Sequence, residues 1–113
     1  MWTNPNPSEI FDGQVVAFNS SDYDYVVMVC AETKDAPSIT YTSGHAEAEQ
    51  RTTCIVFSWT ADKPQRINRH ITVSSDKSTA TITRCAVVES GQSSSATDNT
   101  KMIPLKIIGY CYQ

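Results

Sequence analysis

Apolar side chains follow one another without alternation at only one place in the chain, Asp24–Ala31, which has the sequence Asp-Tyr-Val-Val-Met-Val-Cys-Ala. Successive residues of an extended strand point to opposite sides, so Val26 and Val27 need apolar surroundings on both sides. Turn-forming residues flank the run, which limits it to the length of a strand and argues against a core helix. The pattern therefore predicts a central strand with both faces buried.

Shorter segments of β-favouring residues, each bounded by turn-forming residues, predict the remaining strands. They cover Gln14–Phe18, Ser38–Thr42, Thr52–Trp59, Arg66–Ser74, Thr79–Val88 and Met102–Tyr112. The tight turn Ser75-Asp76-Lys77-Ser78 predicts a hairpin of the two strands beside it. About seven to eight short strands without a helical period between them predict an all-β fold, a jelly-roll-like antiparallel β-sandwich, with a small barrel as the alternative.

The alternation also predicts which side chains form the core. In Thr52–Trp59 the largest residues share one face, which we expect to be the core face: Thr53, Ile55, Phe57 and Trp59. In Arg66–Ser74 the expected inward residues are Ile67, Ile71 and Val73, and Arg69 falls on the same face. Because an unpaired buried guanidinium is very costly, we expect Arg69 to lie near the end of its strand or to pair with a carboxylate.

The two later strands are interpreted in the same way. In Thr79–Val88, Arg84 interrupts an apolar face made of Ala80, Ile82, Ala86 and Val88, as Arg69 does in the preceding strand. In the last strand the expected core residues are Ile103, Leu105, Ile107 and Cys111. Since this strand ends the chain, it must be held by neighbours in the sheet.

The segments between the strands are polar. Residues 1–12 are predicted to form an extended N-terminal arm, because the prolines of Asn4-Pro5 and Asn6-Pro7 cannot donate to a sheet. Thr42–Arg51 and Glu89–Asn99 are predicted to be exposed loops of the kind that carry recognition. Within the first loop, His45–Arg51 has a helix-favouring composition but no apolar stripe, so we expect at most one helical turn there.

Composition narrows the classes of function. A chain of 113 residues fits a single domain, residues 1–113. The net charge of −3 and the pI of about 5.2 leave no basic face for a phosphate backbone, so we expect no nucleic-acid partner. No apolar run approaches the ~18 residues of a membrane span, and the start lacks the features of a signal peptide, so we expect synthesis in the cytoplasm and no membrane insertion.

The four cysteines are Cys30, Cys54, Cys85 and Cys111. Each lies in an apolar or β-rich segment, and no two form the Cys-x-x-Cys pattern of a zinc knuckle. We therefore expect small, buried free thiols in a reducing compartment. Disulfide pairing across strands is the alternative, with three connectivities that the sequence does not distinguish.

Catalytic and metal-binding patterns are weak. His45 falls in a polar loop and His70 on the outward face of a strand, and neither lies in a recognisable nucleophile motif. The set His45, Glu47 and Glu49 contains potential metal ligands, but a solvated acidic loop is the simpler explanation. The glycines are too sparse for a phosphate-binding loop. We expect no enzyme, no catalytic residue, no cofactor and no metal site.

Binding is better supported than chemistry. Asp22 and Asp24 lack the rest of a calcium loop, so we expect them to cap the start of the following strand. A sugar-binding surface needs an aromatic platform beside polar loops, and Tyr110, Tyr112 and Trp59 are its candidates if they are exposed. The alternative is that these rings lie in the core or in a contact between subunits.

Both ends of the chain carry recognisable motifs. The first is Trp2-Thr3-Asn4-Pro5-Asn6-Pro7, continuing through Phe11, Gln14 and Val16 to Tyr23-Asp24-Tyr25-Val26-Val27. The second is Asp98-Asn99-Thr100 followed by Ile103-Pro104-Leu105-Lys106-Ile107-Ile108-Gly109. In order and together, they resemble a module found near the C-termini of tail and other structural proteins of bacteriophages and prophages, many of them from gut bacteria. The resemblance covers about a third of the chain, and Tyr110-Cys111-Tyr112-Gln113 extends past the usual end of the module.

The resemblance implies a non-enzymatic domain of a virion component that attaches to a host surface or takes part in virion assembly. The implied partners are further copies of the chain, with a trimer as the expected oligomer, other virion proteins, and a bacterial surface glycan or protein. The alternative from another class is a small secreted, disulfide-stapled binding protein such as an effector, toxin or inhibitor. A third alternative, an enzyme of unknown type, requires His45 or His70 to lie in a pocket with a carboxylate.

Overall fold

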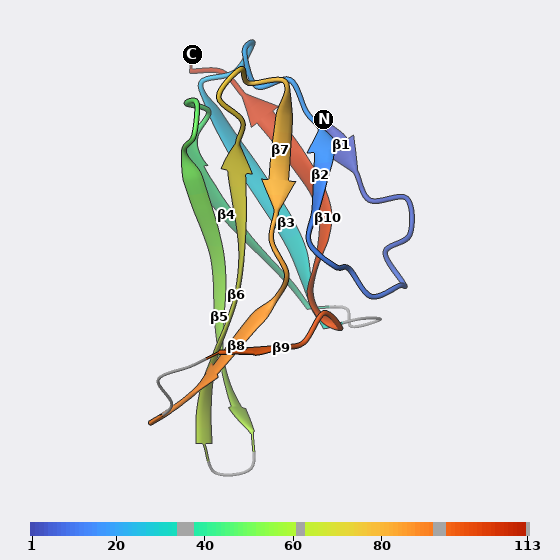
Figure 1. Cartoon of the computed structure of the whole chain (residues 1–113), viewed down its shortest axis with the longest axis vertical. Helices are drawn as coiled ribbons and strands as arrows, with labels where there is room; N and C mark the ends of the chain where they lie inside the picture. The colour runs from blue at the N-terminus through green and yellow to red at the C-terminus, as the bar shows by residue number, and fades with distance from the viewer. Residues whose placement is uncertain (34–37, 61–62, 92–94, 113) are drawn as a thin grey trace.

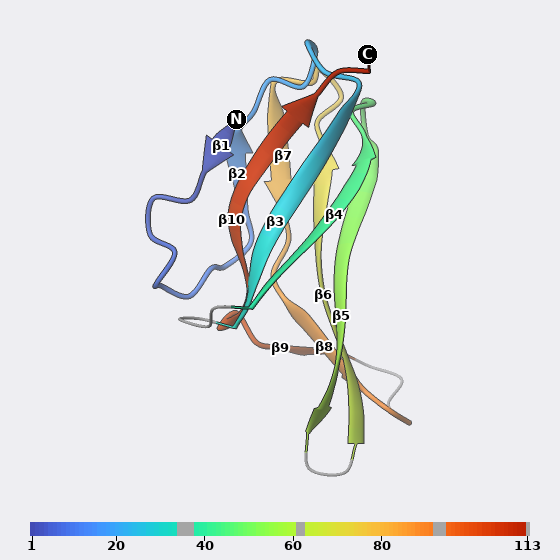
Figure 2. The ribbon, with the colours of Figure 1, turned by 180° about the vertical axis from the view of Figure 1, so that it is seen from behind.

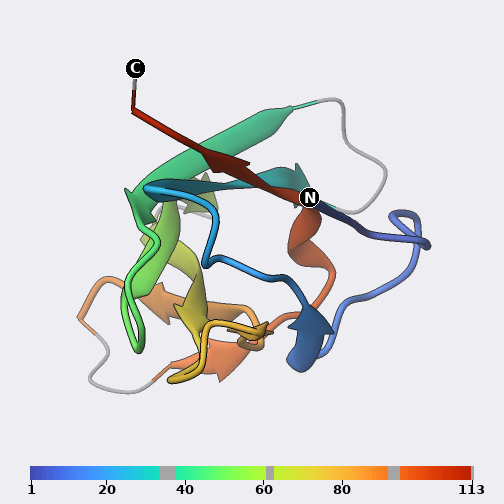
Figure 3. The same cartoon turned by 90° about the horizontal axis from the view of Figure 1, so that it is seen from above.

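The fold is a sandwich of two antiparallel β-sheets, as the sequence pattern predicts (Figure 1). A computed structural model describes residues 1–33, 38–60, 63–91 and 95–112. This part of the chain contains ten strands and no helix, and hence no helix that could cross a membrane. Seen from above, the two sheets form two layers with the core between them (Figure 3).

The two sheets have different sizes. The four-stranded sheet has the order β1 (Trp2–Thr3), β10 (Lys101–Tyr110), β3 (Tyr25–Thr33) and β4 (Ile39–His45). The six-stranded sheet has the order β2 (Gln14–Ala17), β7 (Thr79–Ile82), β6 (Lys63–Val73), β8 (Ala86–Glu89) and β9 (Ala96–Thr97), with β5 (Arg51–Thr60) on the free edge of β6. The strand count exceeds the prediction because β1 and β9 are two-residue strands and one predicted strand is divided into β7 and β8.

Strand β3 is central in its sheet but is not buried on both faces. It pairs with β10 on one side and with β4 on the other. Val26, Met28 and Cys30 point into the core, whereas Tyr25 and Val29 on the opposite face are only half-buried. The prediction of double burial is wrong because no third layer covers the outer face of a two-layer sandwich (Figure 3).

Strand β5 faces the opposite way from the prediction. Cys54 is fully buried on its inner face, while Ile55 and Phe57 are 44% and 75% exposed. The end of the β5–β6 hairpin projects beyond the other strands (Figures 1 and 2), so a large side chain there has no opposing sheet to pack against. A one-residue change of phase exchanges the two faces of a strand, and in the observed phase Cys54 meets Cys30 in the core. The side chain of Trp59 lies outside the described part of the structure.

The predicted strand Thr79–Val88 is interrupted after Ile82. Both β7 and β8 pair with β6, and the hairpin between β6 and β7 is confirmed. At the interruption the Thr83 hydroxyl accepts a hydrogen bond from the His70 backbone N–H at 2.9 Å. The irregularity shifts the alternation, so Cys85 and Val87 are buried and Arg84 is exposed, contrary to the prediction.

Strand β10 also departs from strict alternation. Met102, Ile103 and Pro104 are all buried, because an irregularity between Pro104 and Lys106 shifts the register against β3. Ile107 returns to the core, as predicted. Cys111 follows the end of the strand and is exposed, so its prediction as a core residue is wrong.

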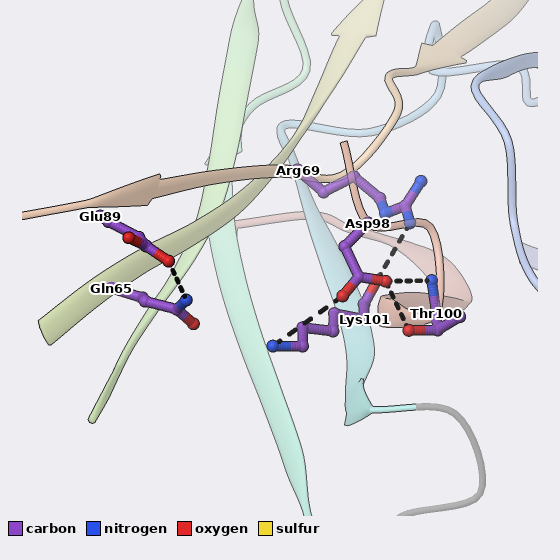
Figure 4. Close-up of polar contacts among 6 residues, drawn as sticks. All are labelled: Gln65, Arg69, Glu89, Asp98, Thr100 and Lys101. Atoms are coloured by element: carbon purple, nitrogen blue, oxygen red, sulfur yellow. Dashed lines mark hydrogen bonds and ion pairs between the residues drawn. The ribbon is translucent and has the colours of Figure 1, made fainter. Parts of the chain in front are cut away.

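Arg69 lies in the middle of β6 with no exposed surface. Its guanidinium donates to four backbone carbonyls, those of Met102 at 2.7 Å, Thr83 at 2.8 Å, Phe11 at 2.9 Å and Lys101 at 3.0 Å. It also lies over the ring of Phe11, 5.3 Å from the centroid. Carbonyl dipoles thus replace the carboxylate or strand-end position that we expected, and Figure 4 shows the bond to Lys101.

The backbone around Arg69 is shaped to bring these carbonyls together. Successive carbonyls of an extended strand point to opposite sides, yet those of Lys101 and Met102 both meet the guanidinium. Met102 accordingly has a φ of 49°, in the left-handed region that a non-glycine residue rarely adopts. Just before this segment, the Asp98 carboxylate accepts hydrogen bonds from the Thr100 backbone N–H and hydroxyl, which stabilise the turn that leads into β10 (Figure 4).

The two motif-bearing ends of the chain contact each other. Trp2 packs edge-on against Phe11, with ring centroids 6.0 Å apart. Asn4 is buried and donates from its side chain to the Pro104 carbonyl at 2.8 Å. The Phe11 backbone N–H donates to the Asn99 carbonyl at 3.1 Å. The predicted arm therefore docks onto the C-terminal strand, which gives a structural reason for the motifs to occur together.

Replacing Arg69 should destabilise the whole sandwich. In R69M the carbonyls of Met102, Phe11, Thr83 and Lys101 lose a buried donor, so we expect the free energy of unfolding to fall by about 3–5 kcal/mol. R69K keeps the charge but not the planar set of donors, and should lose a smaller amount. Urea unfolding monitored by circular dichroism measures both changes. R84M removes an exposed arginine as the control, and equal stability of R69M and R84M would contradict the role given to Arg69.

Gly109 is required by the close approach of Tyr23. A Cβ atom at position 109 would lie 2.2 Å from a carbon of the Tyr23 ring, which itself stacks on Phe18. We expect G109A to lower the free energy of unfolding by about 1–3 kcal/mol, because the ring must move. Thermal unfolding measures this loss. If the clash is the cause, G109A should cost much less in a Y23A background, and an unchanged cost there would show another cause.

Candidate functional site

Three tyrosines and a histidine gather at one end of the four-stranded sheet, on its outer face. Tyr25 at the start of β3 pairs with Tyr110 at the end of β10, and on its other side with His45 at the end of β4. These strand ends lie together beside the C-terminus (Figure 2). The rings of Tyr25 and Tyr110 stack with centroids 5.3 Å apart and planes at 15°.

Tyr112 completes this tyrosine platform, by which we mean Tyr25, Tyr110 and Tyr112. It follows β10 and stacks on Tyr25, with centroids 5.7 Å apart and planes at 27°. Its backbone N–H donates to Asp24 Oδ2 at 2.6 Å, and its hydroxyl lies 3.5 Å from His45 Nδ1. The tail beyond the strand is therefore held in place by specific contacts.

The platform borders a shallow hollow of about 340 Å³ that Tyr25, Ser43, Gly44, His45 and Tyr112 line. Tyr110 and Tyr112 are 42% and 66% exposed. Flat, electron-rich ring faces pack against the C–H groups on one face of a sugar, while hydroxyl and imidazole groups bind its hydroxyls. The arrangement is suited to a carbohydrate and holds no described carboxylate in its lining.

Sequence reasoning found part of this site. Tyr110 and Tyr112 are exposed, as the aromatic-platform hypothesis requires, and each stacks on Tyr25. Trp59, the third candidate, lies outside the residues whose side chains are described. Tyr25 was missed because it begins the segment that we expected to be buried on both faces. The available signal was a tyrosine at the start of one strand, Tyr25, and two near the end of another, Tyr110 and Tyr112. Only the register of β3 with β10 brings them together.

Strands take up part of each of the two predicted recognition loops. β4 continues to His45, so the loop that follows is short, and Glu49 in its turn has a φ of 63°. In the second loop Asn99 is structural, because it accepts from the Cys85 backbone N–H at 2.9 Å and donates to Asp12 at 2.6 Å. Residues 92–94 of that loop lie outside the described part.

The other candidate residues do not converge. Among the described residues, no three His, Cys, Asp or Glu side chains come together as metal ligands, so Glu47 and Glu49 form no such set with His45. Asp24 binds the Tyr112 backbone, and the Asp22 carbonyl accepts from the Cys111 thiol at 3.2 Å. Both aspartates thus hold the C-terminal tail.

His70 lies on the outward face of β6, as predicted. Its Nδ1 lies 2.6 Å from the Thr53 hydroxyl. Burial lowers the pKa of His70, and the nearby charges of Arg51 and Arg66 lower it further. Its hollow, like that of His45, has no carboxylate among the lining residues described.

The cysteines are free thiols in the structure. Cys30, Cys54 and Cys85 are buried, as expected, whereas Cys111 is exposed. Cys30 and Cys54 meet between the two sheets, and their hydrogen bond together with burial raises the pKa of the Cys30 thiol. Burial also raises the pKa of Cys85. The thiolate is the reactive form, so Cys30 and Cys85 should be inert. The hydrogen bond with Cys30 lowers the pKa of Cys54, but its full burial keeps reagents away from it.

Thiol counting tests this arrangement. We expect dithionitrobenzoate to modify one thiol, Cys111, in the native protein and four after unfolding without a reductant. The variant C111S should show none in the native state. A count below four in the unfolded wild type would reveal a disulfide, for which Cys30 and Cys54 are the adjacent pair, and would favour the disulfide-stapled secreted alternative.

No protein-family model matches the chain, and the searches of curated proteins and of solved structures also give no match.

Proposed function

We propose that the chain is a non-enzymatic module of a bacteriophage or prophage tail that attaches to carbohydrate on the host surface through the tyrosine platform. In this proposal it works in the virion as a homo-oligomer, with a trimer as the expected state, beside other virion proteins. Attachment, rather than assembly alone, is the role that the geometry of the platform supports best.

The observation that carries the proposal is the exposed, ordered stack of Tyr25, Tyr110 and Tyr112. Stacked rings at the rim of a sheet leave large apolar faces in water, which is a feature of binding surfaces. Hydrogen bonds of the tail to Asp24 and His45 hold Tyr112 before any ligand arrives, so little conformational entropy is lost on binding.

Two further features support the assignment to a virion module. The motif residues Trp2, Asn4 and Phe11 have structural roles. The resemblance therefore supports a shared scaffold and does not identify the ligand. The outer face of the four-stranded sheet carries half-buried Val27 and Val29, which supports self-association of copies.

A binding screen tests the proposal. We expect the protein to bind cells of a susceptible bacterium and glycans from its surface, and Y112A to weaken that binding at least about tenfold, which is about 1.4 kcal/mol. A glycan array and whole-cell pull-down measure the binding, and native mass spectrometry measures the oligomer.

Tyr41 provides the matched control. It is 74% exposed on β4 of the same sheet, but it lies opposite Val29, outside the platform. Y41A should bind like the wild type. Strictly monomeric protein without affinity for any bacterial surface would contradict the proposed function, whereas equal binding of Y112A and wild type would move the site away from the platform.

A further inference from the structure

A second hollow lies on the opposite sheet from the tyrosine platform. This groove of about 440 Å³ crosses the outer face of β5, β6 and β8, the face that Figure 1 presents. Its polar lining consists of Arg51, Thr53, Arg66, Asn68, His70 and Ser95. None of these residues contributes to the platform, so the groove has a separate role to explain.

The register of the β5–β6 hairpin sets the layout of the groove. Arg51 lies at one end and Arg66, opposite Phe57, at the other. The span from Arg51 to Phe57 is roughly 20 Å at the rise of an extended strand. Ile55, Asn68 and Ala86 form a row across its middle. Two positive ends are thus separated by a neutral, partly apolar centre.

The described lining of the groove is positively charged, and Glu89 lies in an adjoining hollow that Arg66 also lines. No Asp or Glu is among the described residues that line it. Within the described part of the chain, neither Arg51 nor Arg66 forms an ion pair. The charges of Arg51 and Arg66 both lower the pKa of His70. This surface is positively charged, although the chain as a whole has a net charge of −3.

Asn68 places a polar side chain at the centre of the groove. It is only 7% exposed and lines the centre of the groove, on the face opposite to the buried side chains of Ile67 and Arg69. No described residue hydrogen-bonds its side chain, and no buried side-chain nitrogen or oxygen of the described residues lacks a partner, so the Asn68 amide is open to the solvent in the groove. The groove therefore offers a solvent-accessible donor and acceptor at its centre.

We propose that this groove binds an acidic oligosaccharide whose carboxylates lie at the two arginines. Arg51 and Arg66 present planar forks of donors that match a carboxylate. Between them, Asn68 hydrogen-bonds sugar hydroxyls, and so does His70, whose ring is oriented by its contact with Thr53. Ile55 packs against the C–H face of a sugar ring.

The layout favours a polysaccharide over a nucleic acid. A single strand carries a phosphate on every nucleotide, so some of its charges would face the neutral centre at Ile55 and Ala86. Single-strand binding grooves also use successive aromatic rings for base stacking, whereas the described lining of this groove contains no Phe, Tyr or Trp and Phe57 lies only beside its Arg66 end. Carboxylates separated by uncharged sugar hydroxyls fit the spacing of the two arginines better.

Nuclear magnetic resonance titration of the full chain tests this proposal without relying on the proposed function. The probes are a short hyaluronan oligosaccharide and a short unsulfated chondroitin oligosaccharide, in which a uronic acid alternates with an uncharged sugar, with the methyl-esterified hyaluronan oligosaccharide as the neutral control of the same backbone. We expect at least one acidic probe to bind with a micromolar to low-millimolar Kd and to shift the backbone amides of residues 51–55 and 66–70. The ester should bind at least about tenfold more weakly.

Variants locate the contacts. R51Q and R66Q should each weaken the binding of the acidic probe about tenfold, and N68A should weaken it severalfold, whereas R84Q, at an exposed arginine outside the groove, should not change it. The wild-type comparison of acid and ester stands even if a variant fails to fold. Absence of shifts with both acidic probes, equal affinity for acid and ester, shifts confined to Tyr25, His45, Tyr110 and Tyr112, or tighter binding of a single-stranded oligonucleotide at the same amides would each overturn the proposal.

Discussion

Arg69 is a cation at the centre of an apolar core, and the backbone around it is arranged to compensate its burial. Burial lowers the pKa of Arg69, but a guanidinium stays protonated in proteins, so the charge must be met by dipoles. The four carbonyls that meet it come from the N-terminal arm, the break between β7 and β8, and the start of β10. One side chain thereby joins segments that are distant in sequence and belong to different layers.

The core around Arg69 uses the inner faces of both sheets, so binding has to take place on the outer faces and at the rims. The two outer faces differ in chemistry. The four-stranded sheet presents stacked tyrosines at one end, and the six-stranded sheet presents a groove with an arginine at each end. Both surfaces stand on paired strands, which position side chains more rigidly than loops do.

Prediction from the sequence succeeded where a local pattern specifies the structure. It failed where tertiary packing decides which of the two faces of a strand turns inward. The strand positions, the β6–β7 hairpin and the inward side of β6 follow from alternation and turn residues. The inward face of β5 does not, because Ile55 and Phe57 are the more apolar choice, yet the hairpin end has no opposing layer. The arginine groove was not foreseen, because Thr53 and Ile55 were assigned to the core and Arg51 to a polar loop.

By itself the sequence determined the class of fold, the order of the strands along the chain, and the presence of aromatic candidates near the C-terminus, whose exposure the structure decided. Tertiary structure decided which carbonyls meet Arg69, which face of β5 turns inward, and that Tyr25 stacks with Tyr110 and Tyr112. The physical reason is that alternation specifies two equivalent faces for every strand. Only the register between strands and the presence or absence of an opposing layer make those faces different.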